Sequence, residues 1–80
     1  FEAKEWSKAV DILQQARKRF PEQKTLAKNE LISWLNWSVT LSEKKDWAMA
    51  VKVLEQAVKR FPEDDQLLEN LKICRENLDP

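Results

Sequence analysis

The chain has 80 residues, of which 42% are hydrophobic and 35% are charged, so its composition predicts one small folded domain and excludes a disordered chain. No apolar run approaches the roughly 20 residues that a membrane-spanning helix needs. The 14 basic and 14 acidic residues cancel, which removes any whole-domain electrostatic attraction to nucleic acid or to an anionic membrane surface.

The residue types that the sequence lacks bear on chemistry. It contains no histidine, glycine or tyrosine, so it lacks the commonest acid–base and metal-binding residue and the residue that phosphate-binding loops need. We therefore expect no enzyme, no metal and no cofactor. The single cysteine, Cys74, cannot form an internal disulfide, which leaves the compartment open and slightly favours a reducing one such as the cytoplasm. Because the chain starts at Phe1 without a signal-peptide pattern, we expect it to be part of a longer protein.

Two helices are predicted in the first half of the chain. The first runs from Ala3 or Lys4 to Phe20, because Pro21 pushes the residue before it out of the helical region. Its apolar face contains Trp6, Ala9, Val10, Leu13, Ala16 and Phe20. The second predicted helix spans about residues 24–43, and its apolar face contains Ala27, Leu31, Trp34, Trp37, Ser38 and Leu41.

Two further helices are predicted in the second half. The third follows Asp46, a favourable N-cap, and ends at Phe61 before Pro62. Asp64 or Asp65 caps the fourth, at about residues 66–77. The apolar stripe of this last helix contains Leu67, Leu68, Leu71, Cys74 and Leu78. Four helices with short connections and no candidate strand predict an all-α fold.

One segment occurs twice in the chain. Residues 9–21 read AVDILQQARKRFP and residues 50–62 read AVKVLEQAVKRFP. Trp6 precedes the first copy as Trp47 precedes the second, so both the tryptophans and the terminal prolines are 41 residues apart. A repeat without a gap is typical of helical arrays built by stacking one unit.

The segment 31–64 resembles the tetratricopeptide repeat (TPR), a helix–turn–helix unit of about 34 residues. The residues at the family positions are Trp34, Trp37, Ser38 and Leu41 on the first helix and Ala50, Ala57 and Pro62 on the second. The resemblance implies an antiparallel helix–turn–helix array of about four helices, a fragment of a right-handed α-solenoid. Within a single domain over residues 1–80, we expect a half repeat at 1–21, a full repeat with a long helix at 22–62 and a capping helix at 63–80.

The sequence departs from the family pattern at two places. The repeat of 41 residues is seven longer than the family unit, and the excess falls between Pro21 and Trp34. Seven residues are about two helical turns, so the long helix keeps its apolar face and its extra turns should overhang the neighbouring helices. Lys45 stands where glycine is common before the turn between the two helices.

A second resemblance is to the half-a-TPR repeats of RNA-processing scaffolds, which also carry paired aromatic residues such as Trp34 and Trp37 on the first helix. The acidic residue late in that helix and the arginine-rich second helix of those repeats are poorly matched here. The TPR interpretation is therefore favoured.

The resemblance implies a protein–protein interaction module or scaffold that binds a peptide or partner helix through its concave face. The candidate binding residues are Leu35, Asn36, Val39, Gln66, Asn70 and Ile73. Asn36 matches one asparagine of the clamp with which some TPR arrays hold a carboxyl-terminal tail, but Gln66 and Asn70 do not match, so no clamp is predicted. The alternative is a structural helical segment that flanks another domain and binds nothing.

Other candidates for chemistry have simpler structural interpretations. Cys74 is predicted to be a small core residue, because no histidine is present to activate it. The basic clusters at 17–19 and 59–60 are interpreted as solvated ends of helices, where the helix dipole favours cations. The four tryptophans are interpreted as core residues.

The two ends of the array lead to different predictions. The first helix lacks the helix that precedes it in a full repeat, so the face of Trp6, Ala9 and Leu13 is open and a homo-oligomer through this N-terminal edge is expected. The last helix carries Lys72 and Arg75 at positions that face a following helix in an internal repeat. Two charged residues there predict that this helix caps the array.

Overall fold

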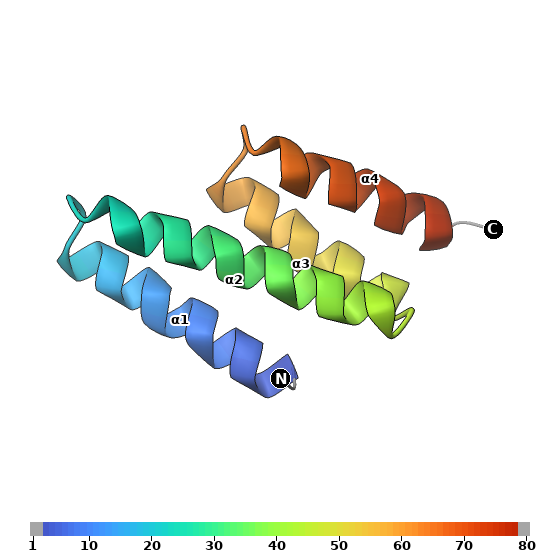
Figure 1. Ribbon diagram of the computed structural model, residues 1–80, viewed down its shortest axis with the longest axis horizontal. Helices are drawn as coiled ribbons and strands as arrows, with labels where there is room; N and C mark the ends of the chain where they lie inside the picture. Colours follow the sequence, from blue (N-terminus) through green and yellow to red (C-terminus); the bar gives the residue numbers. More distant parts are fainter. Residues whose placement is uncertain (1–2, 79–80) are drawn as a thin grey trace.

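The computed structural model describes residues 3–78, with side chains from residue 5 onward. This part of the chain forms α1 (Ala3–Arg19), α2 (Lys24–Glu43), α3 (Trp47–Arg60) and α4 (Asp65–Leu78), joined by short turns (Figure 1). No strand occurs among the described residues, so the all-α prediction is confirmed. The predicted helix ends agree with the observed ones to within one residue.

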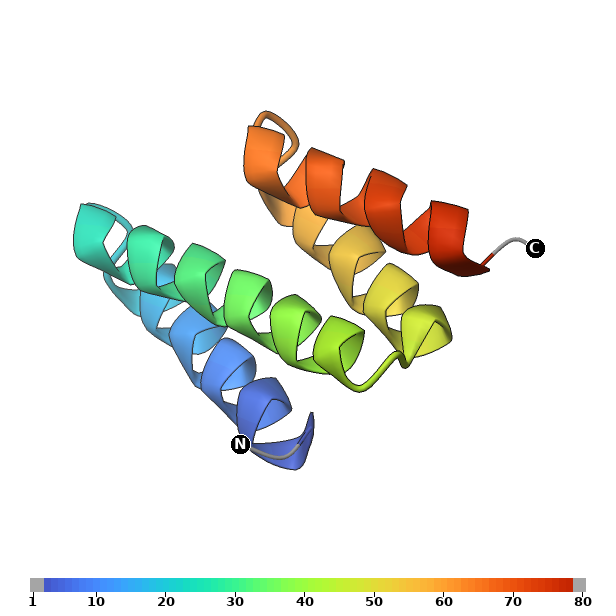
Figure 2. The ribbon, with the colours of Figure 1, turned by 45° about the vertical axis from the view of Figure 1, so that its right-hand side comes forward.

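The helices form a simple antiparallel array. Helix α1 packs on α2, α2 on α3 and α3 on α4, and α2 also meets α4. Figures 1 and 2 show α1 and α4 at opposite edges of the array, with α3 visible between α2 and α4. This arrangement gives the array a face on which α2 and α4 are neighbours, as expected for successive first helices of a helical repeat.

The sequence repeat is also a structural repeat. Where α1 ends, the Phe20 amide donates a hydrogen bond of 2.8 Å to the Ala16 carbonyl. Where α3 ends, the Phe61 amide donates one of 2.9 Å to the Ala57 carbonyl, which is the same bond 41 residues later. The aromatic residue before each proline therefore ends its helix in the same way.

Two aspartates cap helices as predicted. Asp64 Oδ1 accepts a hydrogen bond of 2.9 Å from the Leu67 amide at the start of α4, which decides between the two candidate caps. Asp46 Oδ1 accepts a longer bond of 3.4 Å from the Met49 amide at the start of α3. Helix α2 begins after Gln23, whose side chain makes no capping hydrogen bond.

Lys45 occupies the position where the family prefers glycine, and its backbone adopts the conformation that glycine would adopt. Its φ is 61°, in the left-handed region. The Lys45 amide donates to the Ser42 carbonyl at 2.9 Å, and the Asp46 amide donates to the Leu41 carbonyl at 2.9 Å. These two bonds form a Schellman motif, which satisfies the last carbonyls of α2. The left-handed residue is therefore present without glycine, at the cost of backbone strain.

The hydrophobic core lies where α3 packs between α2 and α4. Ala50, Leu54 and Ala57 of α3 have no exposed surface, and neither has Leu67 of α4. The complete set of buried apolar residues is Val10, Trp34, Trp37, Leu41, Ala50, Val51, Val53, Leu54, Ala57, Leu67, Leu71 and Cys74. The two alanines of the family pattern are thus fully enclosed, consistent with small side chains being needed between closely packed helices.

The tryptophans contribute to this core to different extents. Trp34 and Trp37 of α2 are buried and stack on each other, with ring centroids 5.8 Å apart and an interplanar angle of 15°. Trp6 and Trp47 are half-buried and pack against the core from its margin. The core interpretation is confirmed for the first pair, and the second pair keeps part of its surface in solvent.

Two predictions about α4 need correction. Leu68 and Leu78 were assigned to the apolar stripe, but they are 42% and 48% exposed, and the buried residues of α4 are Leu67, Leu71 and Cys74. Arg75 is exposed and also reaches α3, where its Nη2 lies 3.1 Å from Glu55 Oε2. Lys72 is exposed, and Asp79 and Pro80 lie outside the described residues. The capping role of this helix stays a prediction.

Candidate functional site

A hollow of about 300 Å³ lies between α2 and α4. Its lining residues come from three helices and are Ser38, Val39, Ser42 and Glu43 of α2, Asn70, Ile73 and Cys74 of α4, and Trp47 of α3. A volume of this size is at the lower end of the range for binding pockets and has room for one large apolar side chain.

The rim of the hollow is apolar and open to solvent. Val39 is 46% exposed on α2 and Ile73 is 44% exposed on α4. Cys74 also lines the hollow but is only 2% exposed, and its Sγ lies 3.4 Å from the Ser42 hydroxyl. Two aliphatic side chains on facing helices therefore leave apolar surface in water, and a ligand that covers this surface gains hydrophobic stabilisation.

Charge is sparse along this face. In a chain with 35% charged residues, residues 31–42 of α2 contain none. On α4, uncharged residues recur at helical spacing, at Gln66, Asn70, Ile73 and Asn77. Glu43 is the one charged residue among those that line the hollow. The surface around the hollow therefore consists mainly of apolar and amide groups.

The structure brings together three of the six predicted binding residues. Val39, Asn70 and Ile73 line the hollow. Leu35 is half-buried against the core. Asn36 and Gln66 are exposed and lie outside the lining. Three of the six predicted residues therefore line the hollow, and the other three do not.

The prediction omitted lining residues at the carboxyl end of α2. Ser42 and Glu43 follow Val39 by three and four residues, so helical spacing places them on the same face, and this signal was available in the sequence. Trp47 was assigned to the core alone. It is half-buried and lines the hollow as well, because it follows directly on the turn that ends α2.

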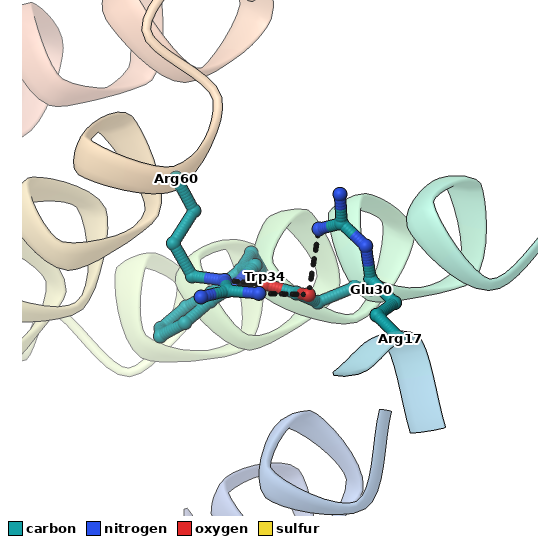
Figure 3. A network of polar contacts seen from close by, with 4 residues as sticks. All are labelled: Arg17, Glu30, Trp34 and Arg60. Atoms are coloured by element: carbon teal, nitrogen blue, oxygen red, sulfur yellow. Dashed lines mark hydrogen bonds and ion pairs between the residues drawn. The ribbon is translucent and has the colours of Figure 1, made fainter. Parts of the chain in front are cut away.

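A second polar feature lies at the other end of α2, around Glu30. This carboxylate has no exposed surface. Among the described residues, Glu30 is the only acidic residue that is completely buried. Arg60 of α3 donates to both carboxylate oxygens, through Nε to Oε2 and through Nη2 to Oε1 at 2.8 Å (Figure 3). Arg17 Nη1 of α1 donates to Oε1 at 3.0 Å, and Trp34 Nε1 donates to Oε2 at 2.9 Å. Glu30 thereby connects three helices.

The hydrogen bonds of this cluster decide the charge state of Glu30. Burial alone would raise the pKa of its carboxyl, but hydrogen bonds from Arg60, Trp34 and Arg17 outweigh burial and lower the pKa below its ordinary value. The bond to Glu30 raises the pKa of Arg60. Glu30 is therefore ionised at neutral pH, with its charge balanced by two guanidinium groups that are each about one-third exposed.

This cluster corrects the interpretation of the basic residues as solvated helix ends. That interpretation is wrong for Arg17 and Arg60, which bind Glu30, and Arg17 also lies over the Phe61 ring, 5.3 Å from its centroid. Lys18, Arg19 and Lys59 remain exposed, as predicted. Because both oxygens of Glu30 are occupied and no surface of it is exposed, the cluster stabilises helix packing and offers no group to a substrate.

Other kinds of site find no support in the part of the chain that the structure describes. There, no group of three or more histidine, cysteine, aspartate or glutamate side chains is arranged to hold a metal ion. No described helix combines the length and the apolar character needed to cross a bilayer. The four helices, their repeated turn and the open apolar hollow define a helical-repeat protein.

The family to which this array belongs follows from comparison with known proteins. The family model of the tetratricopeptide repeat matches residues 1–22 and 33–64, which is more than half of the chain. The chain therefore belongs to the tetratricopeptide repeat family, a non-enzymatic repeat family whose members are generally protein–protein interaction modules. No curated protein and no solved structure matches the chain.

Between its two matched segments the family model leaves out residues 23–32, which contain the excess of the sequence repeat over the family unit. They form the first turns of α2 and include Glu30. The expectation that these turns overhang their neighbours is wrong at Glu30, which is fully buried, whereas Lys28 and Asn29 just before it are exposed. The ion cluster thus attaches the extra turns of α2 to α1 and α3.

Proposed function

We propose that this protein binds a peptide or a helix of a partner protein through the face shared by α2 and α4. An apolar side chain of the partner occupies the hollow between Val39 and Ile73. The observation that carries this proposal is the pair of exposed aliphatic residues, from two different helices, on the rim of one apolar hollow. The family supports the same general role, since its repeats are generally interaction modules.

The polar residues around the hollow suggest which partner fits. The Asn70 side chain can both donate and accept a hydrogen bond, which suits the backbone of an extended or helical peptide. Glu43, the charged member of the lining, favours a partner with a basic residue next to its apolar anchor. A short segment with one large apolar residue and an adjacent lysine or arginine is therefore the expected ligand.

A phage-displayed library of random peptides, selected on the immobilised protein, tests this proposal. We expect enriched peptides to share an apolar residue beside a basic one. The variants Val39→Glu and Ile73→Glu should each weaken a selected peptide by at least about tenfold, because a carboxylate placed in the hollow would be desolvated by the ligand.

The matched control is Leu68→Glu, which places the same charge on an equally exposed apolar position of α4 outside the hollow. This variant should bind the selected peptides as the unmodified protein does. Circular dichroism should show the same helical content in all three variants. A selection that enriches no peptide, or peptides that bind the Ile73→Glu variant unchanged, would contradict the proposal and favour a structural segment that binds nothing.

A further inference from the structure

Helix α2 is apolar on two sides. Trp34, Trp37 and Leu41 of this helix are buried in the core. Ile32 and Val39 lie on the opposite side and are 43% and 46% exposed. They are seven residues apart, which is about two turns, so they form one stripe along the exposed side of the helix. The stripe carries aliphatic surface beyond the hollow, because Val39 lines the hollow and Ile32 does not.

The equivalent positions on α4 show that this stripe lies on the open face of the array. Gln66 follows Ile32 by 34 residues, which is the length of the family unit, and it is exposed although α4 packs beside α2. Ile73 follows Val39 by the same number of residues and is 44% exposed. A helix packed beside α2 in the way that α2 packs beside α4 would therefore leave the stripe uncovered.

A charged residue stands at each end of the stripe. Lys28 precedes Ile32 by four residues and Glu43 follows Val39 by four, so helical spacing places both charges next to the aliphatic residues. Both are exposed, and the ion pairs among the described residues involve neither of them. The exposed residues of α2 between them are uncharged. The stripe is therefore basic at one end, aliphatic in the middle and acidic at the other end.

The other charged residues near this face lie outside the stripe. Lys24, one turn before Lys28, adds to the basic end. The turns that flank α2 carry charges of both signs, at Glu22, Lys44, Lys45 and Asp46. On α4, helical spacing separates the residues that line the hollow from a charged stripe, which consists of Asp65, Glu69, Lys72 and Glu76. The order of charge along the stripe of α2 is therefore set by Lys28 and Glu43.

The spacing of Ile32 and Val39 fits a helical ligand better than an extended one. Seven residues of α2 span about 10.5 Å, at 1.5 Å per residue. Residues on one side of an extended peptide are about 6.7 Å or about 13.4 Å apart, so a strand that lies along the stripe matches one aliphatic residue and misses the other. Residues seven apart on a second helix have the same spacing as the stripe.

We propose that the partner presents an amphipathic helix to this stripe, with two apolar residues seven positions apart and opposite charges near its ends. The inference rests on the proposed function, because one apolar residue occupies the hollow beside Val39 while the other contacts Ile32. The acidic end of the partner helix lies opposite Lys28 and its basic end lies opposite Glu43, so the charges of the two surfaces are complementary. A segment of roughly 16 residues covers this stripe and is only marginally helical when free, so its helix forms mainly on binding.

Two synthetic peptides of identical composition test the proposal. Both are alanine-rich, with a glutamate near one end and a lysine near the other. Their two leucines are seven residues apart in the first peptide and five apart in the second, which places them on different sides of a helix. We expect the first peptide to bind at least about tenfold more tightly and to gain helical circular dichroism on binding. Equal affinities, or binding without a gain of helix, would overturn the proposal.

The variant Ile32→Ser separates this inference from the proposed function, because Ile32 lies outside the hollow. It should weaken the first peptide by roughly fivefold. Leu68→Ser, at an equally exposed apolar position of α4, is the matched control and should bind as the unmodified protein does. Ligands that depend on Val39 but not on Ile32 would overturn the helical ligand and leave the proposed function standing. If neither these peptides nor any library peptide binds, both are overturned.

The two charges are tested by exchange at low ionic strength. Lys28→Glu and Glu43→Lys each give the stripe two ends of the same sign, so one end of the first peptide is repelled whichever way the peptide lies. Each variant should weaken binding by roughly fivefold. The variant with both substitutions should bind as the unmodified protein does, because the peptide can then lie in the reverse direction. A double variant weaker than both single variants would overturn the charge arrangement.

Discussion

Arg60, in the last turn of α3, donates hydrogen bonds to both carboxylate oxygens of Glu30, which lies 30 residues earlier in α2 and is completely buried. Arg17 of α1 donates to the same carboxylate. Three helices that are separate in sequence therefore meet at one acidic group, at the end of the array opposite the turn between α2 and α3. Removing a buried charge that balances two cations is generally more costly than removing an exposed one.

Glu30→Gln should destabilise the fold by about 1–3 kcal/mol, because the neutral amide cannot balance two guanidinium groups and loses charge-assisted hydrogen bonds. The two arginines are about one-third exposed and recover part of this loss by hydration. Chemical denaturation measures the difference. Glu55→Gln is the control, since Glu55 also pairs with an arginine but is exposed, and its effect should stay below about 1 kcal/mol. Equal effects of the two substitutions would contradict the proposed role of Glu30.

The stability of the protein should fall on acidification in a way that depends on Glu30. Because folding lowers the pKa of this carboxyl, its contribution is fully present above the pKa of the unfolded chain, at about 4.3, and is lost as the pH falls through the lower folded value. The free energies of unfolding of the unmodified protein and the Glu30→Gln variant, measured between neutral pH and acid, should therefore draw together as the pH falls from the unfolded pKa through the lower folded pKa. Parallel pH dependences would show that the Glu30 pKa is unchanged by folding.

Lys45→Gly should stabilise the protein by about 0.5–1 kcal/mol, because glycine adopts the left-handed backbone at this position without steric strain. Lys44→Gly is the matched control. Lys44 has right-handed backbone angles, so glycine only adds flexibility there and should destabilise by about 0.5–1 kcal/mol. Thermal melts of the two variants should shift in opposite directions, and a shift in the same direction would contradict the turn geometry.

Ala50→Leu should cost about 1–3 kcal/mol, because Ala50 has no exposed surface and a larger side chain would force α2, α3 and α4 apart. Ala48→Leu places the same side chain on the exposed face of α3 and should change stability by less than about 0.5 kcal/mol. Equal melting temperatures of these two variants would contradict the interpretation that the family alanines lie between closely packed helices.

The helices were predictable because their signals are local. Prolines at 21 and 62, aspartate caps and apolar residues at helical spacing lie within a few residues of the helix ends they define. The ion cluster was not predicted, because the arginine partners of Glu30 lie 13 and 30 residues away in the sequence. The position of Glu30 one turn before Trp34, on the apolar face of α2, was the available signal.

The hollow between α2 and α4 was predictable only in part. The family pattern indicates which helices line the concave face, and three of the residues selected on that face, Val39, Asn70 and Ile73, line the hollow. Helical spacing could not reveal that a hollow remains between α2 and α4 near the carboxyl end of α2. That depends on the angle between two helices that are not consecutive, which the sequence does not specify locally.

Chemical-shift mapping with a selected peptide tests the proposed binding face most directly. In ¹H–¹⁵N spectra of the labelled protein, titration with the peptide should shift the amides of Val39, Ser42, Asn70 and Ile73, together with the indole N–H of Trp47. The signals of the outer face of α1, around Ile12, should stay in place at a protein concentration where the chain is monomeric. Shifts confined to α1, or spread evenly over all four helices, would contradict a binding site between α2 and α4.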